Sequence, residues 1–284
     1  MNRESVASAA SMADHCVPRC HRWLSLARCS LLLVGASLSP AAFAEPPKSP
    51  LAGYELAWAD EFNGDALDKG KWTYRTDSKH LSTQKPENVS VHDGFLHLVL
   101  KKEAAGGKNY TGAGIISQQA FKYGYFEARM KMPAKAGWHT SFWLQKHDGT
   151  GTTDSQEALQ GLDVAQNDSI DPLTYTVTLN KYNPEPPANY GYQRLAAPDL
   201  SADFHVFGCE FTAEAARFYL DGKLVHAVSA SAIQHGEQNL WVTSIASHMG
   251  GTRQVDESAL PQSALCDYVR IFTRPTQAPA PNSP

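Results

Sequence analysis

The sequence has no excess of basic residues. Its 284 residues include 25 lysines and arginines against 29 aspartates and glutamates, a formal net charge of −4. Binding to nucleic acid requires a basic surface that neutralises phosphates, so the balance argues against that class of partner. The 6 Trp, 11 Tyr and 11 Phe residues argue against a disordered chain, because they supply apolar area that offsets the entropy lost on folding.

Long hydrophobic runs are also missing. The most apolar stretch, residues 29–38 (CSLLLVGASL), is about half as long as a membrane-spanning helix requires. It follows a region rich in arginine, residues 19–28, and it leads to Ala42-Phe43-Ala44, the small-x-small pattern of a signal cleavage site. We therefore predict a secretory signal over residues 1–44, cleaved after Ala44. The mature protein is expected to be secreted or periplasmic, without a membrane segment.

Cysteine is scarce, with five residues in all, and only Cys209 and Cys266 follow the predicted cleavage point. Two cysteines are too few for a metal site built from thiolates. A disulfide requires Cα atoms within about 7 Å, a distance that a sequence does not reveal. A disulfide and two buried free thiols therefore stand as alternatives.

Helical periodicity is nearly absent, and most segments alternate apolar and polar residues with a period of two. Examples are residues 94–100, 125–130, 175–179 and 268–272, which are rich in β-branched and aromatic residues. Such segments predict half-buried strands. We expect an all-β fold, a single antiparallel sandwich over residues 54–275. A short proline-containing leader (residues 45–53) precedes this domain and a disordered, proline-rich tail (residues 276–284) follows it.

Four blocks resemble, in this order, the conserved segments of glycoside hydrolase family 16, the laminarinase and licheninase group. They are residues 58–64 (WADEFNG), 121–129 (FKYGYFEAR), 207–222 (FGCEF…FYLDG) and 267–272 (DYVRIF). The resemblance implies a concanavalin A-like jelly roll of two curved antiparallel sheets, with a glycan groove across the concave face. It also implies a β-linked polysaccharide or oligosaccharide as partner, and we expect a monomer.

The resemblance also identifies the strand that carries the chemistry of the family, which reads E-I-D-V-x-E in its members. A retaining glycosidase uses one such glutamate as nucleophile and the other as acid/base, about 5–5.5 Å apart. Here the matching residues 161–166 read GLDVAQ. Gly161 therefore occupies the nucleophile position and Gln166 the acid/base position, whereas Asp163 is retained. Neither glycine nor glutamine can perform the step that its position requires.

Three classes of function remain open. An exported glycan-binding protein that has lost hydrolysis, or retains very little, agrees best with Gly161 and Gln166. An active endo-glycosidase or transglycosylase on β-glucan or galactan would need displaced carboxylates, for which Glu157 and Asp168 are the nearest candidates. A purely structural or protein-interaction sandwich would have no affinity for glycans.

Sugar rings stack on aromatic side chains, and their hydroxyls bind polar groups. Residues 139, 141, 143 and 145 share one parity of a predicted strand and mix aromatic with polar side chains, whereas 140, 142 and 144 share the parity expected for the core. The candidate carbohydrate-binding residues are Trp138, Trp143, Asn180, Tyr182, Trp241 and His248. Trp138 is the preferred stacking residue.

No cofactor is required by this reading. In some relatives a structural calcium ion lies on the convex face, and the resemblance places its ligands at the Asp267 carboxylate and near Gly94. Two ligands are fewer than the six to eight oxygens that calcium takes, so the calcium site is only a candidate.

Overall fold

The computed structural model describes residues 48–147, 149, 151, 158–183, 186–251 and 254–275. These residues belong to the unit Glu45–Pro284. The predicted signal segment, residues 45–47 and the predicted tail lie outside the described residues. No helix in the described ranges is long and apolar enough to cross a membrane.

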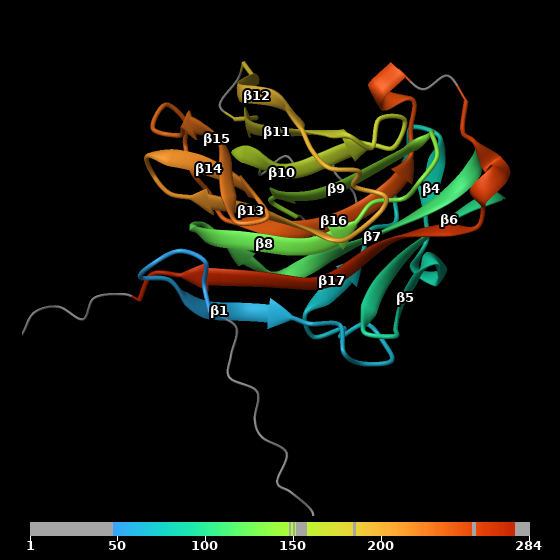
Figure 1. Cartoon of the computed structure of the whole chain (residues 1–284), viewed down its shortest axis with the longest axis horizontal. Helices are drawn as coiled ribbons and strands as arrows, with labels where there is room; N and C mark the ends of the chain where they lie inside the picture. The colour runs from blue at the N-terminus through green and yellow to red at the C-terminus, as the bar shows by residue number, and fades with distance from the viewer. Residues whose placement is uncertain are drawn as a thin grey trace, which may run out of the picture. The chain divides into compact units, whose positions relative to one another are not determined.

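Strands are the main element of the described residues, as the period of two predicts, and they build two main antiparallel sheets. The first sheet has the order β5-β6-β17-β8-β13-β14-β15, and β1 pairs with the end of β17 that β6 leaves free. In Figure 1, β17 lies between β1 and β8. The bounds are β1 Glu55–Asp60, β5 Val89–His92, β6 Phe95–Ala105, β8 Gly124–Lys131, β13 His205–Phe211, β14 Ala215–Leu220, β15 Lys223–Ser229 and β17 Gln262–Thr273.

The second sheet has the order β2-β7-β16-β9-β10-β11-β12, again with antiparallel neighbours. Its bounds are β2 Trp72–Tyr74, β7 Lys108–Phe121, β9 Trp138–Gln145, β10 Gln160–Asp168, β11 Thr174–Lys181, β12 Ala188–Ala196 and β16 Gln238–Ala246. A small hairpin of β3 (Ser78–Lys79) and β4 (Ser82–Gln84) adds to β7, and β4 runs parallel to it. Within the described ranges, the helical segments are the short 3-10 turns η1 Pro86–Asn88, η2 Met249–Gly251 and η3 Glu257–Ala259.

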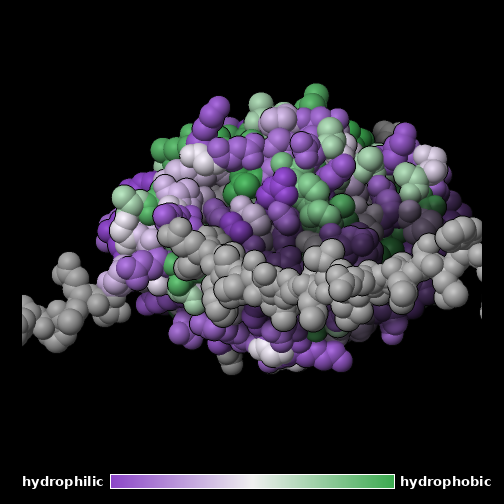
Figure 2. Space-filling view, turned by 60° about the horizontal axis from the view of Figure 1, so that its bottom comes forward, coloured by the Kyte–Doolittle hydropathy of each residue, from purple (hydrophilic) through white to green (hydrophobic). Residues whose placement is uncertain are grey.

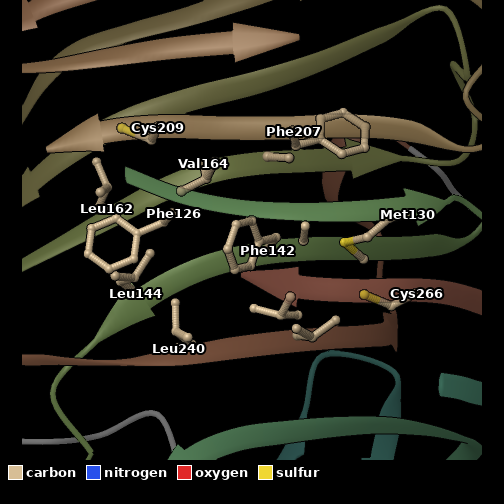
Figure 3. Close-up of a cluster of buried hydrophobic side chains, with 14 of the residues drawn as sticks. Phe126, Met130, Phe142, Leu144, Leu162, Val164, Phe207, Cys209, Leu240 and Cys266 are labelled. Atoms are coloured by element: carbon tan, nitrogen blue, oxygen red, sulfur yellow. The ribbon is translucent and has the colours of Figure 1, made fainter. Parts of the chain in front are cut away.

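One main hydrophobic core lies between the two sheets. Phe126 and Phe207 from the first sheet meet Phe142, Leu162 and Leu240 from the second, and all five side chains are fully buried (Figure 3). Each of these strands therefore has one face in the core and one face turned away from it. The face of the second sheet that points away from the core is called the groove face below.

The two cysteines are free and buried, and burial raises the pKa of both thiols. Cys209 lies on β13 and Cys266 on β17, and Figure 3 shows their sulfur atoms well apart. Of the two alternatives, the structure contains the buried thiols and not the disulfide.

The surface of the described residues agrees with the modest charge of the chain. The face seen in Figure 2 is mainly hydrophilic, and hydrophobic residues on it form small, separate areas. Large exposed hydrophobic side chains are few, and they are Ile170, Leu173, Tyr192, Leu224 and Met249.

Candidate functional site

The strand β10 places the three positions of the family motif on the groove face. Leu162, Val164 and Ala165 point into the main core. Between Asp163 and Gln166 the register with both neighbouring strands shifts, which is the signature of a β-bulge. Because of this shift, Gln166 lies on the same face as Asp163, and their side chains are hydrogen-bonded.

Asp163 is the one carboxylate of the motif, and it is 6% exposed. Asn180 on β11 donates from Nδ2 to Asp163 Oδ2 at 2.9 Å. Burial raises the pKa of Asp163 to about 6, and the hydrogen bonds from Asn180 and Gln166 and the charge of His139 oppose this rise. Asp163 is thus held in place by neutral amides, with no second carboxylate of the motif beside it.

Gly161 lies directly beneath the phenol ring of Tyr182. A Cβ atom at position 161 would lie 2.5 Å from the Tyr182 hydroxyl oxygen and 2.8 Å and 2.9 Å from two ring carbons. The backbone N–H of Tyr182 donates to the carbonyl of Leu159 at 2.8 Å, and this hydrogen bond holds the backbone from which the side chain extends. Burial and the charge of Asp163 raise the pKa of the phenol. The space at the nucleophile position is therefore filled by a neutral aromatic ring.

The predicted alternation of β9 is confirmed. Phe142 and Leu144 lie in the main core, whereas Trp143 points the other way and stacks on Trp241 of β16, with ring centroids 4.8 Å apart. Trp143 is 8% exposed and Trp241 is 0% exposed. The Trp241 indole donates to the carbonyl of Gln145 at 3.1 Å. Trp241 therefore supports Trp143 from behind and, contrary to the prediction, has no surface for a sugar.

The prediction for Trp138 as a stacking residue is wrong in this structure, where the side chain is 1% exposed. It shares the parity of Phe142 and points inward, into a small cluster with Leu100, Ala246 and Val255. The alternation of β9 thus extends to its first residue. His248 is exposed, and its ring centroid lies 5.5 Å from that of His80.

A cavity of about 310 Å³ opens beside Gln166, at the end of the groove face where β10 ends. Its floor includes His139 and Asp168, which face each other across β9 and β10 with Nδ1 and Oδ1 2.8 Å apart. Asp168, a candidate for relocated catalysis, is thus held by a histidine. The other such candidate, Glu157, lies outside the described residues.

Two residues that line this cavity, Ile170 and Met249, were not anticipated from the sequence. Both lie outside the strands of the second sheet, so no alternation marks the face on which they lie. They stand out only because their large apolar side chains are exposed, and exposure cannot be determined without a structure.

The calcium site proposed from the resemblance remains a prediction. Asp267 Oδ2 lies 2.6 Å from Arg129 Nη1, so an ion would have to compete with this pair for the carboxylate. Gly94 lies in the turn between β5 and β6 with φ +79°. In the described ranges, no group of three or more His, Cys, Asp or Glu side chains is arranged to hold a metal ion.

Comparison with known proteins agrees with this architecture. Residues 55–249 match the family model described as beta-porphyranase A-D, GH16 domain. A beta-glucanase of Rhodothermus marinus is 26% identical over 251 residues, which covers 77% of this chain and 85% of that relative. Beta-porphyranase B of Phocaeicola plebeius is 28% identical over 234 residues, which covers 64% of this chain and 70% of that relative.

Among solved structures, SCLam, a non-specific endo-beta-1,3(4)-glucanase from family GH16, superimposes with a TM-score of 0.69 at 26% identity. The superposition covers 80% of this chain and 94% of SCLam. The jelly-roll sandwich that the resemblance implied is therefore confirmed.

Proposed function

The chain belongs to glycoside hydrolase family 16, and from this premise we propose that it binds a β-linked polysaccharide without hydrolysing it by the mechanism of the family. The fold is one that binds glycans, and its relatives include enzymes named beta-glucanase and beta-porphyranase. We propose β-glucans and β-linked galactans as the two classes of polysaccharide to test. The proposal includes export, with cleavage after Ala44, and action as a monomer.

The observation that carries the proposal is the contact between Gly161 and Tyr182. A retaining mechanism requires a carboxylate that attacks the anomeric carbon from this position. Gly161 has no side chain, and the phenol oxygen of Tyr182 lies 2.5 Å from the point at which a Cβ atom of residue 161 would stand. The nucleophile is therefore absent, and the phenol of Tyr182 lies where its side chain would begin.

The acid/base position supports the same conclusion. Gln166 carries an amide, which has no proton acidic enough to be donated to a leaving oxygen. Its side chain is instead hydrogen-bonded to Asp163. Loss of general acid–base catalysis alone removes about 10²–10⁴-fold in rate, and loss of the nucleophile adds to this.

What remains on the groove face is suited to binding. Asp163, Asn180 and Gln166 supply hydrogen-bond acceptors and donors, and Trp143, which is 8% exposed, lies opposite Asp163 on β9. A few placed polar groups next to an aromatic surface are typical of a carbohydrate site.

The test is to titrate the purified protein with β-1,3-glucan, β-1,3(4)-glucan and porphyran, and to measure new reducing ends in the same samples. We expect saturable binding to at least one of these polysaccharides and no release of reducing ends. The beta-glucanase of Rhodothermus marinus, assayed in parallel, serves as the positive control for cleavage. Release of reducing ends at a rate near that of the control would refute the proposal, and so would a lack of binding to any of the three.

A further inference from the structure

The two sheets end beside each other at one edge of the sandwich. β12 is the outer strand of the second sheet and pairs with β11, and β15 is the outer strand of the first sheet and pairs with β14. β12 and β15 also contact each other (Figure 1). Because they are outer strands, the backbone groups on their free edges need partners other than a neighbouring strand.

Gly191 interrupts the pairing of β12 with β11. The register shifts between Val177 and Leu179, so that Gly191 and Tyr192 together lie opposite the single residue Thr178. Two residues opposite one define a β-bulge, and a glycine with a positive φ is a common first residue of such a bulge. Gly191 has φ +61°. Its backbone groups therefore leave the regular ladder and require a partner elsewhere.

His226 of β15 supplies this partner from the other sheet. Its Nε2 lies 3.0 Å from the carbonyl oxygen of Gly191. Because a carbonyl oxygen only accepts, Nε2 carries the proton and donates. The imidazole ring stacks on Phe218 of β14, with centroids 6.0 Å apart, and Phe218 is fully buried in the main core. A single side chain thus connects the core side of the first sheet to the backbone of the outer strand of the second.

The strands approach so closely that residue 191 has to be glycine. A Cβ atom there would lie 2.6 Å from both Cβ and Cγ2 of Val228 and 3.3 Å from Nε2 of His226. Val228 in turn packs against the main core. The positive φ and the close approach both select glycine at this position. The contact among Gly191, His226 and Val228 is called the edge contact below.

The bulge determines where two tyrosines of β12 lie. Tyr190 and Tyr192 are two residues apart, and in a regular strand both side chains would lie on the same face. Here Tyr190 packs against the main core, whereas Tyr192 is 58% exposed and lines the cavity beside Gln166 on the groove face. A bulge redirects side chains in this way. The edge contact therefore holds the residue at which β12 changes sides.

We propose that His226, a residue of the first sheet, is a positioning residue for the groove face of the second sheet. Its hydrogen bond holds the bulge at Gly191, and the bulge sets the position of β12, the outer strand of that face. His226 acts through Gly191 and does not contact the ligand. The effect on the affinity for a glycan rests on the proposed function, whereas the effect on the backbone of β12 does not.

Amide hydrogen exchange of the native protein, followed by mass spectrometry, tests the edge contact without a ligand. His226→Phe keeps an aromatic ring against Phe218 and removes the donor, whereas His226→Gln keeps an N–H donor. We expect exchange of residues 188–196 to rise by about two- to tenfold in His226→Phe, the effect of one lost hydrogen bond, and to stay near the parent value in His226→Gln. Exchange of β16, in the interior of the sheet, should not change. His205→Ala is the matched control, because His205 also lies in the first sheet but pairs with Asp221.

A second variant tests the same contact from the other strand. Gly191→Ala places a Cβ against Val228 and should increase the exchange of β12 in the same way, so it provides the comparison if His226→Phe does not fold. Titration with the polysaccharide that the parent binds measures the consequence for the groove face. We expect His226→Phe to weaken this binding by about two- to tenfold and His226→Gln to keep it. A general loss of stability would not produce this pattern.

The outcomes separate this proposal from the proposed function. Unchanged exchange of β12 in both His226→Phe and Gly191→Ala would overturn it, and so would equal exchange in His226→Gln and His226→Phe. Faster exchange of β12 with the affinity of the parent would show that His226 holds the strand without positioning the groove face, which also contradicts the proposal. If the parent binds none of the three polysaccharides, the proposed function fails, and the positioning of a binding face fails with it, even where the exchange of β12 rises as expected.

Discussion

The contact between Gly161 and Tyr182 predicts a strong energetic coupling between these two positions. In Gly161→Ala, the new Cβ would lie 2.5 Å from the phenol oxygen, and Cβ atoms in proteins essentially never approach another atom closer than 3.0 Å. The ring has to move, although its backbone is held by the hydrogen bond to Leu159. Overpacking costs about 1–3 kcal/mol of unfolding free energy in a core, and we expect the lower end of that range here, because the contact is with the outer end of the partly buried Tyr182 side chain. The same substitution in a Tyr182→Ala background should cost almost nothing through this contact.

Urea unfolding of the parent, the two single variants and the double variant measures the coupling directly. We expect the double variant to be more stable than the sum of the single effects by about 1 kcal/mol. If the effects of Gly161→Ala and Tyr182→Ala add to within about 0.5 kcal/mol, the two side chains do not compete for the same space, and the reasoning is wrong.

The same competition determines how hydrolysis can be restored. The exchanges Gly161→Glu and Gln166→Glu supply both carboxylates, but the glutamate at position 161 cannot extend while the Tyr182 phenol is in place. Hydrolysis should therefore appear only when Tyr182→Ala is added, and the triple variant should show the bell-shaped pH profile of paired carboxyls. Gly161→Glu with Tyr182→Ala but with Gln166 unchanged is the matched control, and it should stay inactive. Equal activity with and without Tyr182 would contradict this account.

Three further predictions concern buried groups. Burial raises the pKa of Asp163 to about 6 from 3.8, so the cost of its ionisation to stability is absent below about pH 3.8 and complete above about pH 6. Compared with Asp163→Asn, the parent should lose roughly 2–3 kcal/mol of unfolding free energy as the pH rises through this window. Urea titrations that give parallel curves of stability against pH for the two proteins would contradict this prediction. Trp138→Ala should lower the unfolding free energy by about 3–5 kcal/mol, because it leaves a cavity in a buried cluster. A variant that keeps its stability and loses only its affinity for glycans would show that Trp138 is a stacking residue after all. Cys209 and Cys266 should not react with a thiol reagent in the native protein beginning at Glu45, and both should react in urea without reductant. The absence of any reactive thiol in urea would indicate a disulfide between them.

Much of the fold could be predicted from the sequence, because alternation reports which side of a strand each residue takes. Phe142 and Trp143 are neighbours, and their opposite placement, one in the main core and one on the groove face, follows from parity alone. The motif of residues 161–166 likewise located β10.

The rest depended on contacts between strands that alternation does not report. Trp241 has the parity of the groove face but lies beneath Trp143, which covers it. Tyr182, the residue directly after β11, also has that parity. Its ring fills the space above Gly161, because glycine has no side chain to occupy that space. Parity gives the side of a sheet, whereas accessibility depends on what the neighbouring strands place above it.

The most direct test of the central claim is to incubate the protein with an equal amount of a tetrasaccharide that it binds, for several days, and to analyse the mixture by mass spectrometry. At this ratio a single turnover per molecule is detectable, so even very slow cleavage would be seen. The account predicts that the tetrasaccharide stays intact and that no glycosyl-protein adduct forms, while binding persists throughout. Shorter oligosaccharides that appear in proportion to the protein would contradict it.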